Sequence, residues 1–187
     1  MSDELSVENY GPLFHLIGTW EGVKGDDIAP GDDRGTENNK YKERLVLTPI
    51  GMVNNHEQTL FALRYSTMAW RLGVDNPFHE EVGYWLWDGK TSQIMKSFIV
   101  PRGIAVLAGG TANLNDKNFS MAADLGSPTY GICSNQFLDV EFKTVRFELK
   151  VAIIDQNTFS YESDTQIKMK DRDQIFHHTD KNIFTKI

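Results

Sequence analysis

The stretch that decides the fold is residues 144–153, which read TVRFELKVAI. Apolar side chains occupy every second position: Val145, Phe147, Leu149, Val151 and Ile153 alternate with Thr144, Arg146, Glu148 and Lys150. Because successive side chains of a strand point to opposite faces, this pattern predicts a strand with one face in a core and the other in water. The alternation resumes after the turn residues 155–157, so the two segments predict a β-hairpin.

Strand-like segments cover most of the rest of the chain. They are expected at residues 17–23, 40–47, 57–70, 79–88, 92–100, 103–109, 117–124 and 174–187. Turn signals such as Asp88-Gly89 and Pro101-Arg102-Gly103 separate them. About ten short strands with turns at hairpin spacing predict an all-β, antiparallel up-and-down barrel, because closure leaves no unpaired sheet edge.

The 187 residues fit a single domain, with two segments outside the strand pattern. Residues 1–12 are expected to be an N-terminal extension, and residues 10–17 a short helical turn before the first strand. Residues 24–39, KGDDIAPGDDRGTENN, contain almost no apolar side chain and predict a long polar loop. Such a loop is either a surface connection or a lid at the barrel mouth.

Composition excludes several classes of function. The net charge of −7, without a run of Lys and Arg, argues against nucleic acid as a partner. The single cysteine excludes an internal disulfide and a cysteine zinc site. The acidic N-terminus is no signal peptide and no segment is apolar enough to span a membrane, so we expect a cytoplasmic protein without a membrane partner. No nucleophile elbow or phosphate loop is present, and we assign no catalytic residue.

The closing segment holds two of the five histidines, His177 and His178. A neutral imidazole on a strand that faces into a barrel is a ready iron ligand, although a strand-end histidine that faces solvent explains the pair as well. Alternation of apolar residues does not decide whether His177 or His178 points into the barrel. Phe176 and Phe184 share the parity of His178, whereas Ile175, Ile183 and Ile187 share that of His177.

Four segments together resemble the nitrobindin family of haem-binding β-barrels, which is related to the lipocalin and fatty-acid-binding-protein barrels. The segments are Ile17-Gly18-Thr19-Trp20-Glu21-Gly22, the run Tyr41-Lys42-Glu43-Arg44 with Pro49-Ile50-Gly51, the stretch Pro77-Phe78-His79-Glu80-Glu81-Val82-Gly83-Tyr84, and the C-terminal His-Thr-Asp-Lys-Asn. They span nearly the whole chain in the family's order. Two features depart from it: Phe78 replaces a methionine, and the glycines after Gly22 are not evenly spaced.

The resemblance implies a haem b held by one axial histidine, preferably His178 with His177 as the alternative. It implies His79 and Phe78 on the distal side, Thr19 and Trp20 on the first strand, and nitric oxide binding or peroxynitrite isomerisation as activities. Arg102 could meet a propionate or a fatty acid at the mouth. A haem-free carrier of a fatty acid or other small hydrophobic ligand is the rival hypothesis. In either case the wall is expected to include Phe61, Leu63, Tyr84, Leu86, Met95, Phe98, Phe147, Leu149 and Met169.

Overall fold

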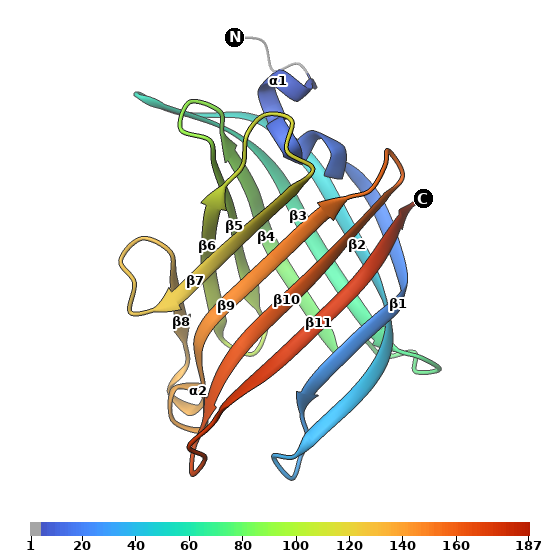
Figure 1. Ribbon diagram of the computed structural model, residues 1–187, viewed down its shortest axis with the longest axis vertical. Helices are drawn as coiled ribbons and strands as arrows, with labels where there is room; N and C mark the ends of the chain where they lie inside the picture. Colours follow the sequence, from blue (N-terminus) through green and yellow to red (C-terminus); the bar gives the residue numbers. More distant parts are fainter. Residues whose placement is uncertain (1–4) are drawn as a thin grey trace.

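The alternating segments close into a barrel in the computed structural model, which describes residues 5–187 (Figure 1). Eleven strands form it within this part of the chain. They are β1 (Gly18–Pro30), β2 (Thr36–Asn55), β3 (Gln58–Arg71), β4 (His79–Asp88), β5 (Gln93–Val100), β6 (Ile104–Thr111), β7 (Asn118–Leu125), β8 (Gly131–Ser134), β9 (Phe142–Ile153), β10 (Thr158–Met169) and β11 (Ile175–Lys186). The predicted all-β antiparallel barrel is confirmed.

Strand pairing follows chain order over most of the barrel. β1 pairs with β2 on one side and with β11 on the other, which closes the sheet. The exception is β8, a four-residue strand that pairs antiparallel with β6 and parallel with β7. A short helix, α2 (Gln136–Glu141), leads from β8 into β9. The extra strand explains why the structure has eleven strands where about ten were expected.

The loop predicted at residues 24–39 is the main error of the sequence interpretation. β1 continues to Pro30 and β2 begins at Thr36, so only the tip of a long hairpin remains outside the strands. Several polar side chains of this hairpin pair with each other across the strands. Lys40 donates to Asp26 at 2.7 Å, and Asn39 donates to Asp27 at 3.0 Å. Low apolar content therefore marks paired polar strands here and no lid.

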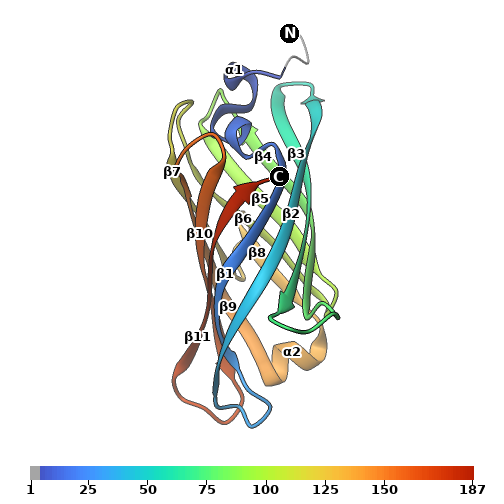
Figure 2. The same cartoon turned by 90° about the vertical axis from the view of Figure 1, so that its right-hand side faces the viewer.

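The N-terminal segment covers one end of the barrel (Figure 2). After helix α1 (Val7–Tyr10), the 3-10 helix η1 (Gly11–Leu16) places Leu13 and Leu16 in the core. Trp20 is fully buried beside it and donates from its indole nitrogen to the Leu16 carbonyl at 2.8 Å. The helical turn expected at residues 10–17 is confirmed. Residues 5–12 of the expected N-terminal extension belong to the segment that closes this barrel end. Residues 1–4 lie outside the described part of the chain.

Inner and outer faces are set by strand parity, with one interruption in β9. A bulge at Val145 turns Thr144 into the interior, where it is 3% exposed, so the alternation read from the sequence fails at that end. The expected wall residues divide into two groups. Phe61, Leu63, Phe98, Phe147, Leu149 and Met169 are buried, whereas Tyr84, Leu86 and Met95 occupy the outer face, contrary to expectation.

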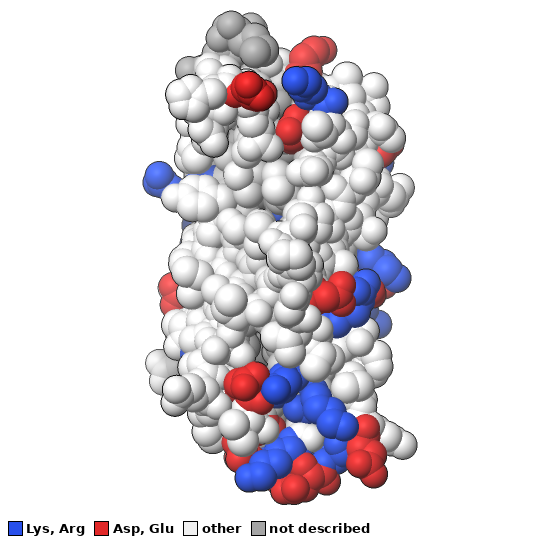
Figure 3. All heavy atoms as spheres, turned by 90° about the vertical axis from the view of Figure 1, so that its left-hand side faces the viewer, with Lys and Arg blue, Asp and Glu red and all other residues white. Residues whose placement is uncertain are grey.

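The outer surface carries an uncharged region, visible in the middle of Figure 3 above a charged lower end. A shallow hollow of about 740 Å³ lies on the outside of β3 to β6. Its lining includes the exposed side chains of Val82, Tyr84, Ile99 and Leu107. No helix among the described residues is long and apolar enough to cross a membrane.

Candidate functional site

The closing strand β11 directs one histidine inward and one outward. His178 shares the inner face with Asp180 and Asn182, and its side chain is 30% exposed. His177 lies on the outer face, 57% exposed, and its Nδ1 is 2.8 Å from Asp164 Oδ2. Of these two histidines, His178 is therefore the one available to a ligand inside the barrel. It lies on the same face of β11 as Phe176 and Phe184.

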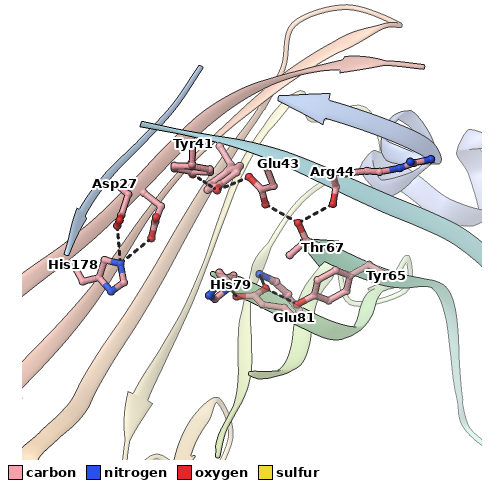
Figure 4. Close-up of polar contacts among 12 residues, drawn as sticks. Asp27, Tyr41, Glu43, Arg44, Tyr65, Thr67, His79, Glu81 and His178 are labelled. Carbon is pink, nitrogen blue, oxygen red and sulfur yellow. Dashed lines mark hydrogen bonds and ion pairs between the residues drawn. The ribbon is translucent and has the colours of Figure 1, made fainter. Parts of the chain in front are cut away.

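His178 faces two aspartates on the inner wall (Figure 4). Its Nε2 lies 3.0 Å from Asp27 Oδ1 and 3.5 Å from Asp180 Oδ2. Burial acts to lower the pKa of His178, but hydrogen bonding to Asp27 and the charge of Asp180 outweigh it and raise the pKa. Burial raises the pKa of Asp180 to about 6, and the nearby Asp27 and Glu43 carboxylates act in the same direction. For Asp27, the contact with His178 outweighs burial and lowers the pKa.

Local features of β1 bring Asp27 into this position. The register with β2 shifts between Gly22 and Gly25, which marks a bulge. A Cβ on Gly25 would lie 2.6 Å from the Tyr41 ring, so only glycine lets that ring pass. Asp27 is then 2% exposed, with Oδ2 held by the Asn39 amide and Oδ1 turned to His178.

A second polar group begins at His79, the first residue of β4, on the opposite wall (Figure 4). His79 Nε2 lies 3.3 Å from Glu81, and the same carboxylate accepts from Lys96 Nζ and the Tyr65 hydroxyl, each at 2.9 Å. Burial acts to raise the pKa of Glu81, but the charge of Lys96 and the contact with His79 lower it far below its usual range. Glu81 in turn outweighs burial at His79 and raises the pKa of that imidazole.

A third carboxylate, Glu43 of β2, lies between these groups and is 8% exposed. It accepts hydrogen bonds from Thr67 Oγ1 at 2.7 Å, the Tyr161 hydroxyl at 3.0 Å and the Asn182 amide at 3.4 Å. The Tyr41 and Tyr161 hydroxyls are 2.8 Å apart. Burial raises the pKa of Glu43 above its usual value. The protonated acid is therefore favoured more here than in water.

The arrangement presents two imidazoles from opposite walls of one barrel end. The positive charge of His79 is close enough to act against protonation of His178. Imidazole nitrogens bind iron or other transition metals, and a ligating histidine commonly holds its second nitrogen against a carboxylate. His178 has that carboxylate in Asp27, and its Nδ1 makes no hydrogen bond to a described residue.

The remaining predicted site residues divide by position. Phe78 lies at the same end, its ring 5.9 Å from that of Tyr41 and 42% exposed. Arg102 lies in the exposed β5–β6 turn, where its carbonyl accepts from Asn135. Thr19 and Trp20 do not join His178. Trp20 pairs with Lys186, eight residues along β11, which corresponds to about 26 Å at the rise of a strand.

Sequence reasoning missed Asp27, Glu43 and Lys96 as parts of the interior. Asp27 was assigned to the polar loop. For Lys96 a signal existed, since it occupies the middle position between Ile94 and Phe98, both buried on the inner face of β5. An ionisable side chain at an inward position of a strand predicts a buried ion pair. Glu81, two residues after His79 on the same strand, is the carboxylate that contacts the His79 imidazole.

Comparison with known proteins supports the class that this barrel and its inward histidine suggest. The sequence matches the profile of the THAP4-like, heme-binding beta-barrel domain over residues 9–186. The chain therefore belongs to this family, and the resemblance to nitrobindins is confirmed. Rv2717c from M. tuberculosis has the same fold, with a TM-score of 0.69 and 16% identity over 92% of this chain and 93% of that one. Among curated proteins, none is significantly similar.

Proposed function

We propose that this protein binds haem b at the end of the barrel where His79 and His178 face each other, with His178 as the axial ligand. The observation that carries the proposal is the inward imidazole of His178, held through Nε2 by the buried Asp27. Membership of a haem-binding barrel family supports the same ligand.

The chain's own residues fit an axially ligated haem in three respects. Asp27 orients the His178 imidazole and adds electron density to it, which strengthens the ring as a donor. His79 lies on the other wall, where Glu81 keeps a proton on or near its imidazole. The Phe78 and Tyr41 rings, in edge contact, offer flat apolar surface at the same end.

If His178 holds a haem, the group would supply iron that can bind a small molecule. We therefore extend the proposal to nitric oxide binding and isomerisation of peroxynitrite to nitrate by the ferric form. His79, whose pKa is raised by its contact with Glu81, would hold a proton close to that small molecule.

Titration of the purified haem-free chain with hemin tests the proposal. We expect a Soret shift that saturates at one hemin per chain and is lost in His178→Ala. The variant His177→Ala is the matched control, because this neighbouring histidine lies on the outer face. Thermal unfolding followed by circular dichroism establishes that both variants fold.

A cavity variant makes the test more specific. In His178→Gly, added imidazole is expected to restore the Soret spectrum if the side chain acts as an iron ligand. Hemin binding that is equal in wild type and His178→Ala contradicts the assignment of His178. Absence of a Soret shift in the wild type contradicts haem binding itself. Displacement of a fluorescent fatty acid would then favour the haem-free carrier.

A further inference from the structure

Three side chains that commonly bind metals converge on the inner wall near the open barrel end: Asp27, His178 and Asp180. One ligand atom from each lies within 4.8 Å of the other two. The Nε2 atom of His178 points at both carboxylates, at 3.0 and 3.5 Å. All three ligand atoms therefore face one small volume.

Backbone pairing fixes this convergence. Asp27 and Asp180 are directly opposite each other in the β1–β11 register, and His178 lies two residues before Asp180 on the same face. Side chains in directly opposite positions have Cβ atoms about 4.5–5.5 Å apart, and like charges in such a pair destabilise a sheet. Two carboxylates facing each other on an inner wall are therefore stabilised by a proton or a metal ion between them.

Positive charge near the two carboxylates comes from the imidazoles of His178 and His79. A single Nε2 proton on His178 can be donated to only one of them, and Asp27 is the nearer. The Lys96 ammonium is bound to Glu81 at 2.9 Å. Besides its 3.5 Å contact with His178, Asp180 lies within hydrogen-bonding reach of Asp27, and its raised pKa favours a proton between the two carboxyl groups that a metal ion would replace.

We infer that Asp27, His178 and Asp180 bind a divalent transition-metal ion in the haem-free protein. One imidazole nitrogen with two carboxylate oxygens suits ions such as Zn²⁺, Co²⁺, Mn²⁺ and Fe²⁺. The site does not rest on the proposed haem function, although both use His178.

The surroundings of the three ligands match such a site. The Asn39 amide holds Asp27 Oδ2 at 3.0 Å and so orients Oδ1 toward the ion, as outer-shell groups of metal sites do. Asp27 is 2% exposed, whereas the side chains of His178 and Asp180 are 30% and 26% exposed. The ion would be enclosed by the β1 wall on one side and could enter from the barrel mouth, where water completes its coordination.

Cobalt is the probe of choice, because its visible spectrum reports on ligands directly. The chain, freed of haem and treated with a chelator, is titrated with CoCl₂, and Zn²⁺ binding is measured by calorimetry. We expect one ion per chain. Asp180→Asn is expected to weaken binding by more than the ~10–100-fold that loss of an outer-shell partner produces. His178→Ala is expected to have the same effect.

The outer face of the same strands provides a matched control. His177 and Asp164 form a histidine–aspartate contact of 2.8 Å without a second carboxylate ligand. Asp164→Asn should therefore leave cobalt binding unchanged. Asp180→Asn removes a like charge from a facing pair, so the variant is expected to fold, and thermal unfolding establishes this.

Two outcomes overturn the metal site: no stoichiometric cobalt binding by the wild type, or binding that Asp180→Asn leaves intact. Hemin titration of Asp180→Asn separates this proposal from the previous one. Asp180 is not a proposed haem ligand, so the variant should lose cobalt and keep the Soret shift. Failure of the haem proposal would appear instead as a wild type that binds cobalt but shows no Soret shift.

Discussion

The Lys96 ammonium lies 2.9 Å from the Glu81 carboxylate inside the barrel, where their side chains are 9% and 12% exposed. The ammonium also lies 4.2 Å from the centroid of the Phe98 ring and 5.2 Å from that of Tyr65. Two opposite charges thus lie beside aromatic rings inside the barrel. Such a pair adds little stability as a whole, but loss of one partner leaves an uncompensated buried charge.

Glu81→Gln is expected to lower the free energy of unfolding by about 3–5 kcal/mol, the usual cost of breaking a buried ion pair. The reason is that Lys96 keeps its charge and loses its counterion. Urea denaturation followed by tryptophan fluorescence measures the change. Glu80→Gln is the control, since the neighbouring Glu80 lies on the opposite face of β4.

The double variant Glu81→Gln with Lys96→Met tests whether the charge itself is responsible. Methionine fills the space of the lysine stem without charge, so the double variant should recover most of the stability lost in Glu81→Gln. If the two changes simply added, the ion pair would not be the source of the effect.

The lowered pKa of Glu81 also predicts a pH dependence. Because the folded-state pKa lies below the unfolded value of about 4.5, ionised Glu81 stabilises the fold above that pH, and the contribution is lost as the pH falls. One such group changes the free energy of unfolding by up to about 1.4 kcal/mol per pH unit. Urea titrations between neutral pH and pH 3 should therefore show a shallower decline in Glu81→Gln than in the wild type.

For Glu43 we predict a pH dependence of the free energy of unfolding with the opposite sign. Its raised pKa means that the protonated acid stabilises the fold below about pH 4.5, and that this contribution is lost as the pH rises through the folded-state pKa. Glu43→Gln replaces the acid by a neutral amide that never ionises. We expect it to be less stable than the wild type by about 1–3 kcal/mol at pH 4, where hydrogen bonds from Thr67 and Tyr161 are impaired.

The difference between Glu43→Gln and the wild type should shrink from pH 4 to pH 8, because only the wild type has to ionise a buried acid. The measurement is the same urea series at several pH values. A difference that grows with pH would show that Glu43 is stabilised as the carboxylate.

Local pattern was enough to predict the barrel but not all of its inner face. The β9–β10 hairpin was predictable because apolar side chains alternate there with charged ones. In β4, Tyr84 and Leu86 are as apolar as Trp85 and Trp87, so the sequence pattern does not show which pair points inward. The prediction placed Tyr84 and Leu86 on the inner wall, whereas Trp85 and Trp87 are the buried pair. The bulge at Val145 is likewise invisible in residue types.

The candidate site was less predictable because its partners are distant in sequence. Asp27 and His178 are 151 residues apart and meet only through closure of β1 on β11. Without that register, an acidic residue between Gly25 and Pro30 is typical of a solvated loop. Parity alone did not decide between His177 and His178, because apolar residues share the parity of each; the preference for His178 came from the family resemblance, and the structure places His178 on the inner face.

Trp20, at the plugged end, provides a prediction about the fold that is independent of any ligand. It is fully buried, with its ring 4.8 Å from that of Phe159 in edge-to-face contact and its indole nitrogen bonded to Leu16. Trp20→Ala is expected to lower the free energy of unfolding by about 3–5 kcal/mol, since it leaves a cavity between the 3-10 helix and the barrel.

Trp70→Ala is the matched control for this change. Trp70 is only partly buried, and the Lys42 ammonium lies over its ring, 5.5 Å from the ring centroid. Its loss should cost less than that of Trp20, because solvent already reaches the ring and no enclosed cavity forms. Urea denaturation of the two variants compares them directly. Equal losses of unfolding free energy would mean that η1 does not seal the barrel end through Trp20. Trp20→Ala should still take up hemin, because Trp20 lies far from His178 along the barrel.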